Sequence, residues 1–242
     1  MEITVVGIGP GALEQMTPEA REAVLHSDVV VGYTVYVDLV RPLCEGKTVL
    51  STGMTREVER CRMALAAALS GNRVAFVCSG DAGIYGMAGI MCEVAEPHPE
   101  VSIRVLPGIT AACFSAALLG APLTHDFAVI SLSDLLTPWE IIVKRLRLAA
   151  EADFVICLYN PRSKKRQHHL DEAIACIQEH RLATTPAGYV KNAGREGEEA
   201  RCCTLAEIPS CPVDMFTTII IGNSQTRMVN GRLVTPRGYR NL

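Results

Sequence analysis

Residues 74–86 read VAFVCSGDAGIYG, and this stretch decides the fold class. Its first five residues are apolar, as in a strand that is buried on both faces of a parallel sheet. The residues that follow, from Ser79-Gly80-Asp81 to Gly86, are small and permit a tight turn in which a ligand approaches the backbone. Open α/β sheets bind ligands at the carboxyl ends of their strands. Asp81 is therefore a candidate acceptor for an amine or hydroxyl of a small ligand; its alternative role is to cap the helix that follows.

Two further apolar runs in the first half end in glycine-containing turns. Residues 3–6 lead into Gly7-Ile8-Gly9-Pro10-Gly11, and residues 103–106 lead into Pro107-Gly108-Ile109-Thr110-Ala111. The first turn is not a dinucleotide-binding fingerprint, because Pro10 interrupts the glycine pattern. Taken singly, each turn is also compatible with a structural role, such as local backbone hydrogen bonding by Thr110. Three such strand ends in one half of the chain nevertheless predict a shared ligand crevice.

The alternation of strand-like runs with helix-like periods predicts an α/β fold with largely parallel pairing. Strands are expected at residues 3–6, 29–31, 48–50, 74–78, 103–106, 127–131, 154–158, 184–190 and 217–221. Helices are expected at residues 18–26, 56–70, 109–119, 138–150 and 163–180, the second of them capped by Thr55 and ended by Gly71. Asn230-Gly231 between two short runs predicts an antiparallel hairpin. Because residues 119–125 interrupt the pattern, we expect two α/β domains, residues 1–120 and 121–242.

The composition narrows the class of protein. Of the 242 residues, 49% are hydrophobic and 20% are charged, which excludes a disordered chain. The net charge of -3 argues against a nucleic-acid partner. No apolar run reaches the roughly 18 residues that a membrane span needs. The ten cysteines lie mostly in apolar runs and no signal-peptide pattern is present, so we expect buried, reduced thiols in a cytoplasmic protein; a metal site at Cys202, Cys203 and Cys211 lacks further ligands at useful spacing.

The second half carries two groups of residues with more than one interpretation. Arg162, Lys164, Lys165 and Arg166 form a basic run, which is either a solvated helix start or a rim that binds carboxylates. His125-Asp126 is either an acid–base pair or a structural pair. The sequence contains no serine-hydrolase elbow, no zinc-protease motif and no P-loop. These three enzyme classes are therefore excluded.

Together the motifs resemble the tetrapyrrole methylase family, and the resemblance extends over essentially the whole chain. It rests on residues 7–11, 79–81 and 107–111 and on Leu158-Tyr159-Asn160. Further segments are similar to one branch of the family, which methylates C-17 of precorrin-3B or cobalt-factor III and contracts the macrocycle. The most specific of these segments lies within residues 125–140, and the others are residues 32–39, 79–89, 194–198 and 235–239.

This resemblance implies two α/β domains with mixed, mostly parallel sheets and with S-adenosylmethionine in the cleft between them. It also implies a tetrapyrrole substrate and a homodimer, while the spacing of the cysteines and histidines themselves predicts no metal site. The methyl group passes in line from a sulfonium to a ring carbon, a reaction that needs positioning more than a protein nucleophile. The family positions that hold the cofactor correspond here to Pro10, Ser79, Gly80, Asp81, Ile84, Thr110, Ala111, Asn160, Gly188, Ala193 and Thr218.

The resemblance also suggests residues for the remaining chemistry. Ring contraction needs proton transfers and stabilisation of an oxyanion, for which the candidates are Asp81, Tyr85, His125 and Arg195. The substrate carries several acetate and propionate carboxylates, and Arg162, Lys164 and Arg237 are the candidates that would bind them.

Two kinds of alternative stay open. One is another reaction within the family: uroporphyrinogen C-methylation, diphthine synthesis or ribose methylation of ribosomal RNA. Those branches lack the stretch at residues 131–140, and an RNA methylase would carry more basic charge. The other is a non-catalytic protein of the pathway that binds the cofactor or serves as a scaffold. The sequence is compatible with a metal-free or a cobalt-containing substrate.

Overall fold

The computed structural model describes residues 1–163 and 166–239, which form two compact units, Met1–Ala111 and Ala112–Leu242. The division falls after the first residue of the helix Ala111–Leu119, a helix that we expected in the first domain. That helix belongs with the second unit because Ala112 and Leu119 are buried in a core with Val155 and Cys157. The strand at residues 120–121 pairs within the same unit.

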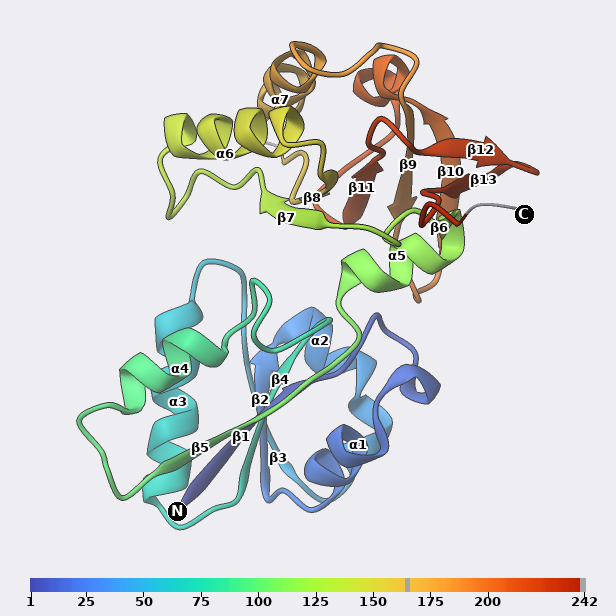
Figure 1. Ribbon diagram of the computed structural model, residues 1–242. Coiled ribbons are helices and arrows are strands. Elements are labelled where there is room, and N and C mark those ends of the chain that lie inside the picture. The colour runs from blue at the N-terminus through green and yellow to red at the C-terminus, as the bar shows by residue number, and fades with distance from the viewer. Residues whose placement is uncertain (164–165, 240–242) are drawn as a thin grey trace. The chain divides into compact units, whose positions relative to one another are not determined.

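The first unit is a five-stranded parallel sheet between two layers of helices (Figure 1). The strand order is β3 (Thr48–Thr52), β2 (Val29–Tyr33), β4 (Val74–Cys78), β1 (Glu2–Gly7), β5 (Ser102–Leu106). One face packs on α3 (Glu57–Leu69) and α4 (Ala88–Ala95), and the other on α1 (Pro18–Leu25) and α2 (Thr34–Leu39). Two short 3-10 helices, Leu13–Gln15 and Arg41–Leu43, complete this unit.

The apolar runs of this unit fill both faces of the sheet. In β1, Ile3 and Val5 lie in the core beside α3 and α4, whereas Val6 lies in the core beside α1 and α2. Every residue of β4, the central strand, is buried. Continuous apolar strands of this kind are expected where a parallel sheet is covered on both sides, so the expected parallel pairing is confirmed here.

The second unit has a mixed five-stranded sheet. The order is β10 (Glu199–Thr204), β9 (Pro186–Lys191), β11 (Thr217–Ile221), β8 (Val155–Tyr159), β7 (Phe127–Ser131). Only β7 and β8 pair in parallel, and the other neighbours in this sheet are antiparallel. Helices α6 (Trp139–Glu151) and α7 (His169–Gln178) and the 3-10 helix Leu205–Ser210 cover one face, and α5 (Ala111–Leu119) covers the other. A small sheet, β12 (Arg227–Val229), β13 (Arg232–Val234) and β6 (Gly120–Ala121), completes this unit.

Several sequence expectations are confirmed in detail. The strand at residues 127–131 has the predicted bounds, and α1 begins at Pro18 with Thr17 as its cap. Asn230 and Gly231 both have positive φ, 49° and 76°, as a type I′ hairpin requires.

Other expectations were wrong. Thr55 does not cap α3: it has φ 64°, and the cap residue is Arg56, which makes no side-chain cap bond. The helix predicted from residue 163 begins only at His169. Helices α2 and α4 and strand β10 were not predicted, because the helices are short and lie in glycine-rich or aromatic surroundings and β10 is largely exposed.

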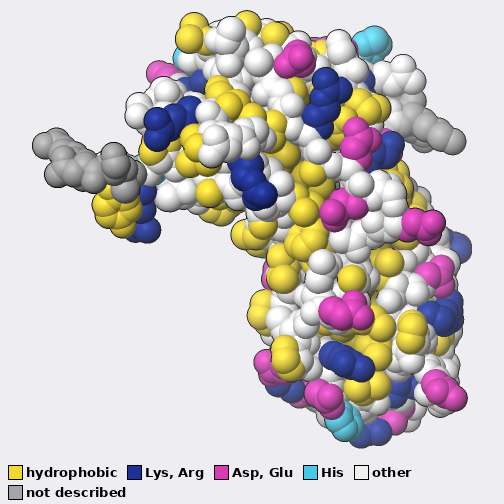
Figure 2. All heavy atoms as spheres, turned by 90° about the vertical axis from the view of Figure 1, so that its right-hand side faces the viewer, with side chains coloured by type: hydrophobic (Ala, Val, Ile, Leu, Met, Phe, Trp, Pro, Cys, Tyr) yellow, Lys and Arg dark blue, Asp and Glu magenta, His cyan; other side chains and the backbone are white. Residues whose placement is uncertain are grey.

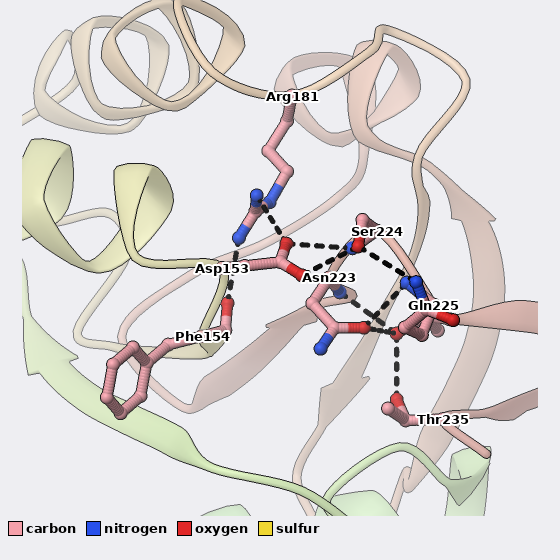
Figure 3. A network of polar contacts seen from close by, with 8 residues as sticks. Asp153, Phe154, Arg181, Asn223, Ser224, Gln225 and Thr235 are labelled. Atoms are coloured by element: carbon pink, nitrogen blue, oxygen red, sulfur yellow. Dashed lines mark hydrogen bonds and ion pairs between the residues drawn. The ribbon is translucent and has the colours of Figure 1, made fainter. Parts of the chain in front are cut away.

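A polar network closes the second unit at the end where β8 begins (Figure 3). The Asp153 carboxylate pairs with Arg181 at 2.6 Å and accepts hydrogen bonds from Ser224 N and Oγ at 2.9 and 2.6 Å. Thr226, in the turn after β11, is joined to Thr235, the residue after β13, by a 2.7 Å hydrogen bond between the two hydroxyls. The Arg181 side chain is only 7% exposed, so its charge depends on Asp153.

Candidate functional site

Three strand ends of the first unit meet through their main chains. Gly9 N donates to Gly80 O at 3.0 Å, and Gly80 N donates to Gly9 O at 2.8 Å. A Cβ added at Gly108 would lie 2.2 Å from Gly80 O and 2.7 Å from the carbonyl of Gly7. A Cβ at Gly7 would lie 2.6 Å from Gly108 N. The sequence prediction that β1, β4 and β5 end at one place is therefore correct, and glycine is required there because backbones touch.

Asp81 joins two of these ends. Its Oδ2 accepts from Gly108 N at 3.0 Å, and its Oδ1 accepts from Gly83 N and Ile84 N at 2.8 and 3.1 Å. The suggested role as a helix cap is wrong, because α4 begins at Ala88 with Met87 as its cap residue. The carboxylate instead fixes the β4 turn to the β5 turn.

The remaining candidates of the first unit surround this junction. Pro10 is buried, Ser79 and Thr110 are half-buried, and Ala111 begins α5. Ile84 and Tyr85 project from the turn after β4 with 43% and 58% of their surfaces exposed. The Cys78 thiol at the end of β4 is buried, which raises its pKa to about 12 and keeps it protonated. The edge thus combines main-chain groups with exposed apolar side chains, and the Cys78 thiol is not a nucleophile there.

The strand register of the second unit gathers a further set of candidates. Ser131 pairs with Tyr159, Ile219 with Leu158, and Thr217 with Lys191. The carboxyl ends of β7, β8 and β9 and the start of β11 therefore share one edge of the sheet. Asn160, Arg162, Ala193, Arg195 and Thr218 lie on these strand ends or the turns beyond them.

Asn160 is the most constrained residue of this edge. It has φ 52°, and its Nδ2 donates to Ser131 Oγ at 2.9 Å. Leu132 N donates to Tyr159 O at 2.9 Å, and the Tyr159 hydroxyl accepts from Ala112 N at 2.7 Å. The Leu158-Tyr159-Asn160 strand end is thereby tied both to β7 and to the start of α5.

The two described arginines of the basic run make contacts within this chain. Arg166 Nη1 donates to Leu132 O at 2.8 Å and to Asn160 O at 3.2 Å. Arg162 Nη2 donates to Asp171 Oδ1 and Pro209 O, both at 2.8 Å. Neither arginine begins a helix, and both already bind groups of this chain. Lys164 and Lys165 lie outside the described residues.

Arg162 nevertheless borders a cavity of about 570 Å³ in the second unit. Its walls come from the segment after β8 and the segment before β11, including Val213, Met215 and Phe216. The Arg162 Nε is buried and has no hydrogen-bond partner. The cavity is thus bordered by the Arg162 side chain, by apolar side chains and by the carboxylates of Asp171 and Asp214.

Two candidates lie away from this edge. His125 precedes β7, so it lies at the opposite end of the sheet from Asn160, and it is exposed. Arg237 follows Thr235, which bonds Thr226 in the turn after β11 at that same opposite end. Gly188 lies within β9, where an added Cβ would meet Leu119 of α5 at 2.9 Å, so packing against α5 explains this glycine. The structure therefore does not bring His125 or Arg237 together with Asn160 and Arg195.

Asp214, which is paired with Lys191, and the cysteines are further ionisable groups of the chain. Burial raises the pKa of Asp214, but hydrogen bonds from Lys191, Phe216 N and Thr217 outweigh it and leave the pKa lowered. Cys202 and Cys203 are adjacent on β10 and pack against opposite faces of the sheet. Cys92 and Cys113 are exposed, contrary to the expectation of buried thiols, whereas six of the other cysteines are buried.

The part of the chain that the structure describes, residues 1–163 and 166–239, contains neither a metal-binding cluster nor a candidate membrane span. No three His, Cys, Asp or Glu side chains in this part are grouped to hold a metal ion. Nor does any helix within it have the length and apolar character needed to cross a membrane. On the face drawn in Figure 2, basic and acidic side chains are interspersed rather than gathered by sign.

Comparison with known proteins identifies the family. Residues 2–209 match the model of the tetrapyrrole (corrin/porphyrin) methylases. The chain belongs to the tetrapyrrole methylase family. The family and the fold expected from the sequence are therefore confirmed.

Individual tetrapyrrole methylases are similar over nearly the whole chain. A probable cobalt-factor III C(17)-methyltransferase of Salmonella typhimurium is 50% identical, with 98% of this chain and 99% of that protein covered. A precorrin-3B C(17)-methyltransferase of Sinorhizobium is 42% identical, with 97% and 96% covered. A cobalt-factor III methyltransferase of Priestia megaterium is 44% identical, but this chain spans only 45% of its length. Among solved structures, the methyltransferase CobJ is 39% identical, with a TM-score of 0.91 over 97% of this chain and 99% of that one.

Proposed function

We propose that this protein is a methyltransferase of cobalamin biosynthesis that methylates C-17 of cobalt-factor III or precorrin-3B and contracts the ring. The observation that carries the proposal is the full-length similarity to relatives named for this reaction. The relative named for the cobalt-containing substrate has the higher identity of the two, 50% against 42%. Cobalt-factor III is therefore the first substrate to test.

S-adenosylmethionine is the proposed cofactor, and the first unit offers a surface that fits it. The ends of β1, β4 and β5 present main-chain groups at glycines, and a Cβ at Gly80 would be in van der Waals contact with Thr110 and Ala111 at 3.7 Å. Pro10, Ser79, Gly80, Thr110 and Ala111 would hold the cofactor from this edge, and Asn160, Ala193 and Thr218 from the edge of the second unit. The cofactor supplies an electrophilic methyl group on a sulfonium sulfur.

The residues of this chain would act by orientation and by charge. Methyl transfer in line to a ring carbon depends on holding the reacting groups in the right geometry, and it requires no protein nucleophile. Asp81 holds two turns with both carboxylate oxygens, so its proposed part in proton transfer would follow release of one of these bonds. Tyr85 and Arg195 are the other candidates for proton transfer and oxyanion stabilisation, and His125 remains a prediction from the resemblance.

Substrate carboxylates are the proposed partners of the Arg162 cavity. Arg162 borders this cavity, and a guanidinium pairs well with the carboxylate of an acetate or propionate group. Lys164 and Arg237 stay as predictions from the resemblance. Charge reversal at Arg162 should weaken binding of the tetrapyrrole, as measured by its KM. An unchanged KM would rule out this contact.

The reaction is tested by incubating the purified protein with S-adenosylmethionine and either cobalt-factor III or metal-free precorrin-3B. Mass and absorption spectra of the product should show one added methyl group and a contracted ring. Addition of a methyl group to uroporphyrinogen instead would assign another reaction of the family. Binding of S-adenosylhomocysteine without any methylation would indicate a non-catalytic binding protein.

The family resemblance further suggests a cytoplasmic homodimer. Light scattering of the purified protein over a range of concentrations measures its mass directly. A mass of one chain at all concentrations would exclude the dimer.

A further inference from the structure

Arg166 occupies a position that no proposed function uses. Its guanidinium lies where β7 and β8 end, and its Nη1 donates to one carbonyl beyond each strand, Leu132 O at 2.8 Å and Asn160 O at 3.2 Å. The side chain is only 14% exposed. Because this arginine is largely buried and donates to two backbone carbonyls, its side chain has a defined conformation, unlike that of an arginine in solvent.

The backbone of Asn160 is in the left-handed region, with φ 52°. Asparagine adopts this conformation more readily than other residues with a side chain, so the contacts around Asn160 select the conformation rather than force it. The side chain of Asn160 is held by Ser131 Oγ at 2.9 Å, and its carbonyl is held by Arg166. The side chain and the main-chain carbonyl of Asn160 are thus both bound by residues that lie outside β8.

A second layer of contacts holds Arg166 in place. Its Nε lies 3.9 Å from Asp134 Oδ1, and Asp134 Oδ2 lies 3.0 Å from His169 Nε2. The hydrogen bond from His169 lowers the pKa of Asp134, which keeps this carboxylate ionised at neutral pH. The His169 ring packs on Trp139 with the ring centroids 4.3 Å apart, and Trp139 Nε1 donates to Glu172 at 2.7 Å. Residues 131–140 are therefore bound to the start of α7 through Asp134 and Trp139.

We propose that Arg166 is a positioning residue that holds Asn160 in the conformation in which it contacts S-adenosylmethionine. This inference rests on the proposed function, because the contact between Asn160 and the cofactor is itself part of that proposal. An arginine suits the task because one planar terminal nitrogen reaches two carbonyls while Nε faces a carboxylate. Arg166 thus serves the cofactor site without touching the cofactor.

The test compares Arg166→Gln and Arg166→Lys with the control Arg147→Gln, which removes an exposed ion pair with Glu179 on the same unit. Calorimetric titration with S-adenosylhomocysteine measures binding, and steady-state kinetics gives KM for S-adenosylmethionine separately from kcat. We expect Arg166→Gln to weaken binding roughly tenfold to hundredfold. Arg166→Lys should recover part of the loss, and Arg147→Gln should bind as the unchanged protein does.

The outcomes separate the two proposals. If Asn160→Ala weakens S-adenosylhomocysteine binding and Arg166→Gln does not, the positioning role is wrong while the cofactor site stands. If Arg166→Gln raises KM only for the tetrapyrrole, Arg166 binds substrate and the inference is overturned. Should Arg166→Gln fail to fold, Arg166→Lys and Ser131→Ala provide the test, and unchanged binding in both would overturn the inference. Methylation by the unchanged protein tests the proposed function independently of every variant.

Discussion

In the first unit, Gly7, Gly80 and Gly108 bring three strand ends into main-chain contact, whereas in the second unit the side chains of Ser131 and Arg166 join the ends of β7 and β8. In the first arrangement an added Cβ at Gly7 or Gly108 would overlap main-chain atoms. The second depends on a few donors and acceptors, and related side chains can replace them in part. The two edges should therefore respond differently to substitution, although both are proposed to bind the same cofactor.

The largest effect is expected at Gly108. In Gly108→Ala the new Cβ would lie 2.2 Å from Gly80 O, so backbone must move. Overpacking typically costs about 1–3 kcal/mol, and we expect about 3 kcal/mol or more here because the atoms that must move are main-chain atoms. Denaturant unfolding measures this loss. Gly89→Ala is the matched control: nothing lies within 4 Å of its Cβ and it is helical, so it should stabilise by about 0.5–1 kcal/mol. Equal stability of the two variants would contradict the close packing at Gly108.

The next effect concerns Asp81, a side chain that joins two turns of the glycine edge. Asp81→Asn leaves one oxygen for three backbone donors, so at least one N–H of Gly83, Ile84 or Gly108 loses its acceptor. The expected loss in unfolding free energy is about 1–3 kcal/mol, together with weaker S-adenosylhomocysteine binding. Asp38→Asn removes an exposed carboxylate paired with Arg41 and should cost less than about 0.5 kcal/mol. A stable Asp81→Asn variant with unchanged binding would show that the brace is dispensable.

The two edges also differ in how far the sequence revealed them. Glycines after apolar runs are visible as a pattern, so the junction of Gly7, Gly80 and Gly108 was predicted before the structure. From the sequence, Arg166 is interpreted only as part of the basic run, because the main-chain carbonyls that accept its hydrogen bonds cannot be identified from a sequence pattern. The strands at residues 184–190 and 217–221 were predicted, but their antiparallel direction was not, for a related reason. A fully buried strand such as β11 has the same apolar run in either direction, and the direction is set by its connections.

The contacts of Asp153 with Ser224 and Arg181, at the end of the second unit where β8 begins, should make the stability of this unit depend on pH. Burial raises the pKa of Asp153, but two hydrogen bonds from Ser224 and the charge of Arg181 outweigh it and lower that pKa below the ordinary 3.8 (Figure 3). The stabilisation is therefore present above pH 3.8 and is lost as the pH falls through the lowered pKa. Asp153→Asn should lower the free energy of unfolding by about 1–2 kcal/mol at pH 7; the loss is this small because Asp153 is 40% exposed to solvent. The difference in unfolding free energy between the variant and the unchanged protein should narrow below pH 3.8. A gap that is constant with pH would mean that the Asp153 charge does not stabilise the fold.

The smallest effect is expected on the same stretch that Asp134 and Trp139 anchor. Leu136 lies between these two residues, and 93% of its surface is exposed, whereas Leu132, four residues earlier, is fully buried in the core of the second unit. Leu136→Ala should change the free energy of unfolding by less than about 0.5 kcal/mol. Leu132→Ala should cost about 2–5 kcal/mol by creating a cavity. Thermal unfolding of the pair measures the difference. A large loss of unfolding free energy in Leu136→Ala would mean that exposed residues of this stretch also stabilise the ends of β7 and β8. The stabilising contacts would then include more than those of Ser131, Asp134 and Arg166.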